Sequence, residues 1–184
     1  MELQPKSKLN KIAFLLLQEI DPQVIDSIIK HTEPLFNAKC QIEKLNLDLN
    51  FAYHQKRKQY NSTSILAYLK PITAKNTYSL AIFNQDLYAS NTSFVFGEAE
   101  VGGRVGIVSL ARLGISSSDD FLALFACKEV THELGHIVGL RHCETKRCVM
   151  SFSSNLVEVE KKSAKFCPDC AHSLAYLAFL NKPS

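Results

Sequence analysis

Glycine and proline are scarce in this sequence of 184 residues, which contains seven glycines and six prolines. Their scarcity excludes a collagen-like chain and leaves no room for a low-complexity linker, and we find no internal repeat. Hydrophobic residues make up 46% of the chain and charged residues 21%, which excludes a disordered protein. Because a chain of this length can bury a full core, we expect one domain over residues 1–184, composed of a larger part (1–139) and a small C-terminal part (140–184).

A strong charge of one sign and long apolar runs are also lacking. The formal net charge of +3 is too small to indicate a nucleic-acid or membrane partner by itself, and no run approaches the roughly 20 apolar residues of a membrane span. The apolar run at 12–17 is shorter than the roughly 7–15 residues of a secretory signal core, and Gln18 and Glu19 follow it. We expect a cytoplasmic monomer without a membrane or nucleic-acid partner.

The hydrophobic pattern alternates between strand-like and helix-like segments. Short apolar or alternating runs predict strands at residues 12–17, 40–49, 77–83, 93–96 and 104–113, with a turn-rich link at 97–103. Helices are predicted to begin at Asp21-Pro22, to cover 62–69, to run from Phe121 to about Val138 after capping residues at 116–120, and to cover 163–180. This order is typical of an α/β fold with a mixed sheet.

Histidines are concentrated in the second half of the predicted long helix. His132 and His136 are four residues apart, so they lie about 40° apart around the helix and one turn above each other. Both imidazoles can bind one Zn²⁺, whereas Glu133 is rotated away from them and is placed to contact the water that the metal activates. Gly139 can adopt a positive φ, end the helix and return His142 as a third ligand. Three histidines leave one coordination position open, which is typical of a catalytic zinc.

Four of the six cysteines form two pairs near the end of the chain. The pairs are Cys143 with Cys148 and Cys167 with Cys170. Their spacing is close to that of a zinc ribbon and predicts a closed structural site of four thiolates, although disulfides and an iron–sulfur cluster are alternatives that the spacing leaves open. Cys40 and Cys127 lie on apolar faces and are expected to be core thiols.

The adjacent residues His142 and Cys143 connect the two predicted metal sites. In extended backbone, neighbouring side chains point in opposite directions, so His142 can bind the first metal while Cys143 binds the second. Our hypothesis is that the cysteine site fixes the third histidine and docks the last helix.

The motif HELGHIVGLRH at 132–142, with Cys143, Cys148, Met150 and CPDC at 167–170 after it, resembles the archaemetzincin family of metzincins. Segments 59–63 and 94–100 are also similar to that family, so the resemblance covers about residues 57–170. It implies a twisted mixed sheet with an edge strand above the cleft, a long active-site helix and a C-terminal helix held by a four-cysteine zinc site. It also implies a Met-turn in which Met150 supports the catalytic metal without binding it.

An edge strand in such a fold would bind substrate by strand addition. The segment Phe94–Phe96, leading into Gly97 and Glu98, is the candidate. Glu98 or Glu100 could then contact the N-terminus of the substrate, although both are equally well explained as solvated acids of a turn.

We therefore predict a zinc-dependent peptidase that acts on peptides or proteins and holds two Zn²⁺ per chain. Glu133 would accept a proton from water and pass it to the leaving amine. Some metzincins carry a tyrosine two residues after the methionine, but this position is Phe152. This difference favours somewhat an alternative, a non-catalytic zinc protein that binds peptides or buffers metal. A second alternative, a nucleic-acid binder, depends on the ribbon-like cysteine spacing and on residues 56–58 (Lys-Arg-Lys), which we interpret as a solvated helix face.

Overall fold

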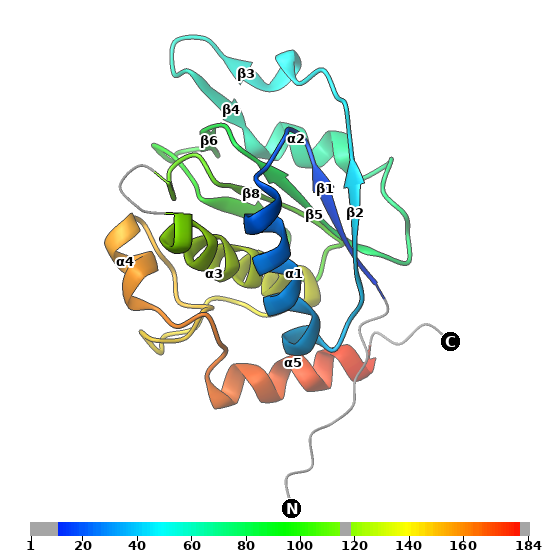
Figure 1. Cartoon of the computed structure of the whole chain (residues 1–184), viewed down its shortest axis with the longest axis vertical. Coiled ribbons are helices and arrows are strands. Elements are labelled where there is room, and N and C mark those ends of the chain that lie inside the picture. Colours follow the sequence, from blue (N-terminus) through cyan, green and yellow to red (C-terminus); the bar gives the residue numbers. More distant parts are fainter. Residues whose placement is uncertain (1–10, 115–118, 181–184) are drawn as a thin grey trace, which may run out of the picture.

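The computed structural model describes residues 11–114 and 119–180. Its main sheet has five strands in the order β2-β1-β5-β8-β7 (Figure 1). The strands are β1 (Ile12–Leu16), β2 (Cys40–Lys44), β5 (Tyr78–Phe83), β7 (Gly97–Ala99) and β8 (Val105–Ser109). The first four strands in this order pair in parallel, and β7 runs antiparallel along β8. The predicted mixed sheet with an edge strand is confirmed.

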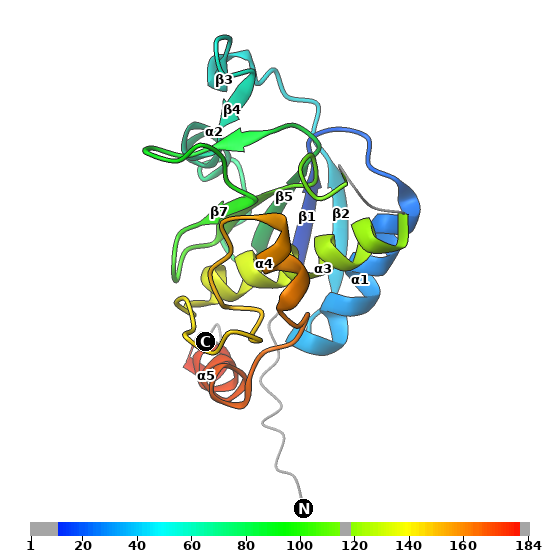
Figure 2. The same cartoon turned by 90° about the vertical axis from the view of Figure 1, so that its left-hand side faces the viewer.

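Helices cover both faces of this sheet (Figure 2). They are α1 (Pro22–Phe36), α2 (Ser62–Leu69), α3 (Asp119–Val138), α4 (Leu156–Lys161) and α5 (Pro168–Leu180). Alternate residues of β1 enter two different cores, because Phe14 packs with residues of α1 and α3 while Leu15 packs with residues of α2. Burial on both faces explains why β1 has a continuous apolar sequence.

Several predicted element boundaries are confirmed. The side chain of Asp21 accepts a hydrogen bond from the Gln23 N–H at 2.8 Å and caps α1, and α2 covers the predicted residues 62–69. Gly139 follows the end of α3 with a φ of +122°. The predicted capping residues 116–118 lie outside the described residues. No helix in the described part of the chain is long and apolar enough to cross a membrane.

Four predicted boundaries are wrong. The strand expected at 104–113 ends at Ser109, and a turn follows it. The strand expected at 93–96 contributes only one isolated bridge, between Val95 and Leu87, and the edge strand lies at 97–99, where we expected a link. The strand at 40–49 ends at Lys44, which pairs with Leu16, the last residue of its neighbour β1. The last helix begins at Pro168 rather than at 163, and the short α4 precedes it.

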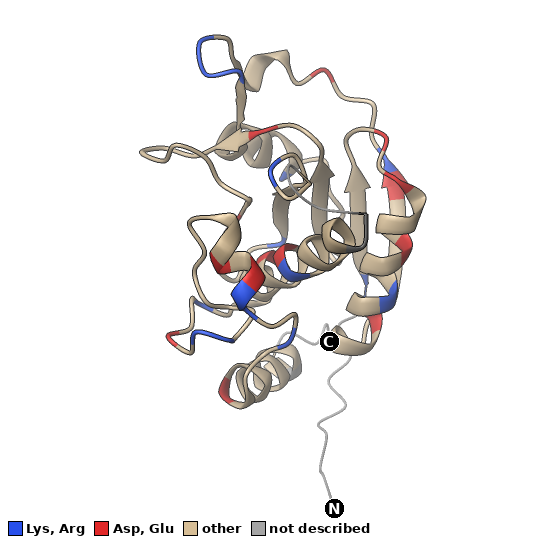
Figure 3. Ribbon diagram, turned by 60° about the vertical axis from the view of Figure 1, so that its left-hand side comes forward, with Lys and Arg blue, Asp and Glu red and all other residues tan. Residues whose placement is uncertain are grey.

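The basic run at 56–58 forms the turn of a hairpin and not the predicted helix face. The hairpin consists of β3 (Tyr53–His54) and β4 (Gln59–Asn61), and β6 (Leu87–Tyr88) extends it to a three-stranded sheet. The run appears at the hairpin tip in Figure 3. Arg57 donates hydrogen bonds to the carbonyl oxygens of Thr92 and Ser93 at 2.7 and 2.9 Å, so the hairpin holds the segment that leads into β7.

Candidate active site

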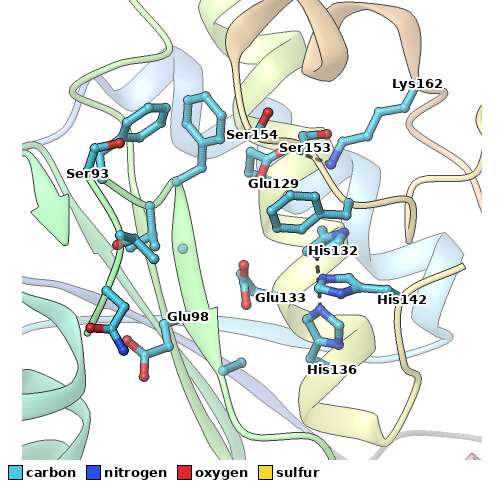
Figure 4. A pocket seen from close by; sticks show the side chains of 18 residues that line it. Ser93, Glu98, Glu129, His132, Glu133, His136, His142, Ser153, Ser154 and Lys162 are labelled. Carbon is cyan, nitrogen blue, oxygen red and sulfur yellow. Dashed lines mark hydrogen bonds and ion pairs between the residues drawn. The ribbon is translucent and has the colours of Figure 1, made fainter. Parts of the chain in front are cut away.

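The structure brings the three predicted histidine ligands together beside the edge strand (Figure 4). The Nε2 atoms of His132 and His136 are 3.1 Å apart on α3. The ring of His142 lies with its centroid 5.2 Å from that of His132 and 4.8 Å from that of His136. One ligand atom from each of the three lies within 4.8 Å of the others, a separation that one metal ion can span.

Backbone carbonyl groups orient the two helical histidines. The Nδ1 atoms of His132 and His136 each lie 2.8 Å from an oxygen, that of Val149 and that of Leu140, respectively. A carbonyl oxygen only accepts, so we assign the ring hydrogen to Nδ1, which leaves the Nε2 lone pair available for a metal. Burial lowers the pKa of His132 and His136, and also that of His142. Neutral imidazoles with free Nε2 atoms fit the requirements of Zn²⁺.

Glu133 lies in the narrow space between α3 and β7. Its carboxyl group is buried, and burial raises its pKa well above the ordinary value. Among the described residues, no hydrogen-bond partner is found for its Oε2 atom. A Cβ atom at Gly97 would lie 2.6 Å from Glu133 Oε1, so only glycine allows β7 to approach this carboxylate. The absence of a side chain at Gly97 therefore determines where the carboxylate can lie.

A pocket of about 500 Å³ opens beside these residues. Its walls come from 91–99, from α3 and from the segment after Met150, and it is lined by Asn91–Ala99, Glu129, His132, Glu133, His136, His142, Phe152–Ser154 and Lys162. Glu98 lines the pocket while accepting hydrogen bonds from the hydroxyl groups of Ser62 and Thr63. Glu100 is not among the lining residues and forms an ion pair with Lys70 at 2.5 Å.

Met150 lies beneath the histidine helix and is completely buried. Its thioether occupies the space that a side chain at Gly135 would need. Its carbonyl oxygen accepts a hydrogen bond from the Cys143 N–H at 2.9 Å. The Met150 backbone therefore holds the strand-like segment that carries His142.

The second predicted cluster also forms, from Cys143, Cys148, Cys167 and Cys170. Their sulfur atoms lie within 4.8 Å of one another, and no disulfide joins these four residues. The Sγ atom of Cys148 accepts hydrogen bonds from the N–H groups of Met150 and Cys167. Hydrogen bonding from the Cys170 N–H is the main cause that lowers the pKa of Cys167 to about 7. Burial raises the pKa of Cys148 and Cys170, so within this cluster a lowered pKa is found for Cys167. Four sulfur atoms this close together fit a tetrahedral zinc site.

The remaining two cysteines have a different environment. Burial raises the pKa of Cys40 to about 12 and that of Cys127 to about 11. Both pack with the core beneath α1 and α3. A raised pKa favours the protonated thiol, which fits the core role expected from their apolar neighbours in the sequence.

Sequence reasoning missed an ion pair that also lines the pocket. Lys162 Nζ, just after α4, lies 2.8 Å from Glu129 Oε1 on α3. The spacing of Glu129, one turn before Glu133, could have indicated that both face the same side of the helix. No sequence signal connects it with Lys162, because 33 positions of chain separate them.

Comparison with known proteins shows which family this chain resembles. The model of peptidase family M54 matches residues 23–176. An archaemetzincin of Methanocaldococcus jannaschii is 40% identical over 160 residues, which cover 82% of this chain and 87% of that protein.

Solved structures agree with this relationship. The crystal structure of archaemetzincin from Methanopyrus kandleri matches with a TM-score of 0.85 and 33% identity over 96% of this chain and 98% of that one. The archaemetzincin of Archaeoglobus fulgidus, crystallised with malonate, matches with a TM-score of 0.77 and 35% identity over 88% of this chain and 98% of that one.

Proposed function

Because this chain belongs to peptidase family M54, the archaemetzincins, and is a zinc metallopeptidase, we propose that His132, His136 and His142 hold its catalytic zinc and that Glu133 is its general base. The observation that carries the proposal is the geometry of α3. The buried Glu133 carboxylate has an oxygen without a hydrogen-bond partner among the described residues. It lies beside the imidazoles of His132 and His136, whose rings are oriented by backbone carbonyl groups. Peptides are the substrates.

The residues of the site divide the chemistry between them. Zinc, when bound, polarises the scissile carbonyl group and makes water more acidic. The three neutral imidazoles supply the lone pairs that hold the metal. Glu133 accepts a proton from water through its free oxygen and later donates that proton to the leaving amine. Met150 supports the histidines from below without contributing a ligand.

We propose that β7 positions the peptide. This strand is at the edge of the sheet, and its outer side faces the pocket, so an extended peptide can add to it as a further strand. The hydroxyl groups of Ser62 and Thr63 fix Glu98 at one end of the pocket. We propose that Glu98 contacts the N-terminus of the substrate; the alternative is that it only anchors the first turn of α2 through these two hydroxyl groups.

The second metal site is proposed to be structural. Cys143, Cys148, Cys167 and Cys170 would hold zinc with no coordination position left open. This site connects the segment of His142 with the start of α5. The chain would then hold two zinc ions, one catalytic and one structural.

The single-domain organisation, the monomeric state and the cytoplasmic location are also proposals. One hydrophobic core includes Val130 and Leu134 from the larger part together with Val149 and Leu174 from the small C-terminal part, which supports one domain. One chain completes both the histidine and the cysteine cluster, so neither site requires a residue from a second copy, which fits a monomer. The six free cysteines fit a reducing compartment. Light scattering of the purified protein would test the monomer.

The contact between Gly97 and Glu133 yields a test of the general base that replaces neither Glu133 nor a histidine ligand. We expect Gly97→Ala to lower kcat by roughly 10–100-fold while zinc content is unchanged, because the added methyl group displaces the Glu133 carboxylate. Rate assays together with metal analysis would measure both. Gly114→Ala is the matched control, since a Cβ atom there meets only ordinary contacts of 3.7 Å or more. An active Gly97→Ala enzyme would show that the carboxylate position is not critical.

A further inference from the structure

The ion pair between Glu129 and Lys162 occupies one end of the pocket, away from Glu98. The two side chains are 4% and 1% exposed, although both line the pocket. Figure 4 places Ser93, Glu129 and Lys162 toward one end and Glu98 and His136 toward the other. Burying such a pair costs desolvation free energy. Its position at a substrate pocket therefore suggests a role other than stabilising the fold.

The ion pair is not needed to attach α4 to α3. The neighbouring Lys128 already donates hydrogen bonds from its Nζ to the carbonyl oxygens of Val159 and Glu160, at 3.0 and 2.8 Å. These bonds cap the C-terminal end of α4, and Val159 is completely buried against the core. Lys162 is therefore available for another role.

The pair has hydrogen-bonding capacity that the described residues do not use. Lys162 Nζ and Glu129 Oε1 are close enough for an ion pair, but neither atom has a hydrogen-bond partner with good geometry in the described part of the chain. The buried Oγ of Ser153, which also lines the pocket, has none there either. Buried polar groups without well-aligned hydrogen bonds cost free energy, so a bound group that supplies an acceptor to Lys162 and a donor to Glu129 would be stabilised.

We propose that this pair binds the carboxamide side chain of a glutamine or asparagine in the substrate, an inference that rests on the proposed function. The pair is neutral as a whole, so a substrate carboxylate or ammonium would leave an uncompensated buried charge. A carboxamide has an oxygen that accepts from Lys162 and N–H groups that donate to Glu129. Phe94, Phe96 and Phe152 line the pocket and provide apolar contacts for the methylene groups of that side chain.

The direction of β7 indicates which substrate residue reaches the pair. The chain passes through 93–96, at the end of the pocket near Glu129 and Lys162, before it enters β7. Antiparallel pairing is the more stable arrangement of two strands. A peptide antiparallel to β7 runs toward Phe96, so the carboxamide belongs to a residue on the C-terminal side of the cleaved bond.

Binding of peptide hydroxamates to the zinc-loaded protein tests this selectivity without hydrolysis. Each compound carries the hydroxamate at its N-terminal end, so its peptide part occupies the C-terminal side of the cleaved bond. The series has one backbone, and the side chain next to the hydroxamate is Gln, Leu, Glu or Lys. We expect the Gln compound to bind about tenfold or more tightly than the others, because two hydrogen bonds form in the pocket. Equal or tighter binding of the Leu compound overturns the proposal, as does a preference for Glu or Lys or no binding at all.

The double variant Glu129→Leu/Lys162→Met tests whether the pair causes the preference. Apolar replacement of a buried ion pair is often tolerated, and thermal unfolding would verify the fold. We expect the preference to reverse, with Leu bound about tenfold more tightly than Gln, since the carboxamide then has no partners. A folded variant that still prefers Gln overturns the proposal, and if the variant does not fold, the wild-type series decides.

Two comparisons separate this inference from the proposed function. Asp26→Leu/Lys30→Met removes an exposed ion pair on α1 and is expected to leave the preference for Gln unchanged. Cleavage of peptides with the same four side chains is measured alongside. Selective binding without any cleavage contradicts the peptidase proposal only, whereas cleavage without a preference for Gln contradicts this inference only.

Discussion

Replacing Glu133 by glutamine is expected to lower kcat/KM for peptide cleavage by on the order of 10³-fold and to leave the zinc content unchanged. A carboxamide has nearly the same size as the carboxylate but cannot accept a proton, and positioned acid–base groups contribute roughly 10²–10⁴-fold. Oε2 of Glu133 has no hydrogen-bond partner among the described residues, so the substitution breaks no contact that we observe there. Digestion of a peptide library, with metal analysis of the same sample, measures both quantities.

The controls for this experiment separate the possible causes of inactivity. Glu43→Gln makes the same change on the exposed strand β2 and is expected to leave the rate unchanged. Loss of zinc in Glu133→Gln would indicate that the carboxylate is a ligand, and an unchanged rate would remove it from the mechanism. A zinc-loaded wild-type protein that cleaves no member of the library would favour the non-catalytic alternative. That alternative is the one favoured by Phe152, which stands where some metzincins carry a tyrosine.

Replacing Cys143 by alanine is expected to remove the zinc of the four-cysteine site and to lower the occupancy of the zinc held by the three histidines. It is also expected to lower the Tm by roughly 10 °C or more. Structural zinc contributes several kcal/mol to folding, and 1 kcal/mol shifts Tm by about 2–4 °C in a chain of this size. The effect should reach the catalytic site, because the Cys143 N–H donates to the Met150 carbonyl and His142 is the preceding residue. Metal analysis and thermal unfolding would measure these losses.

Cys127→Ala is the matched control for this substitution. Cys127 packs in the core, and its loss leaves only a small cavity, which should cost about 1 kcal/mol and keep both zinc ions. Normal occupancy of the catalytic zinc and normal Tm in Cys143→Ala would refute the hypothesis that the cysteine site fixes His142.

Features governed by local chain geometry were predictable from the sequence. Helical periodicity alone brings His132 and His136 together, and Gly139 marks the turn that returns His142. The cysteine cluster was also predictable, because zinc ligands occur at typical spacings. Each of these inferences needs only a short segment or a repeated pair.

Features that depend on contacts between distant segments were not predictable. Gly97 indicated a turn by its residue type, but it lies in β7, paired with β8. Glycine is required there because Glu133 of α3 lies too close for a side chain. The acceptors of the two histidine rings are backbone carbonyls, which leave no signature in side-chain types. The pair of Glu129 and Lys162 requires that α4 fold back onto α3, which neither segment indicates alone.

The use of main-chain oxygens behind His132 and His136 affects how this centre tolerates mutation. Any residue at positions 140 and 149 retains its carbonyl group, so substitutions there leave the acceptors in place. The length of the connecting segment is the sensitive property, because deleting one residue would move one acceptor relative to its ring. The centre should therefore be robust to replacement of these side chains and intolerant of insertions and deletions between Leu140 and Val149.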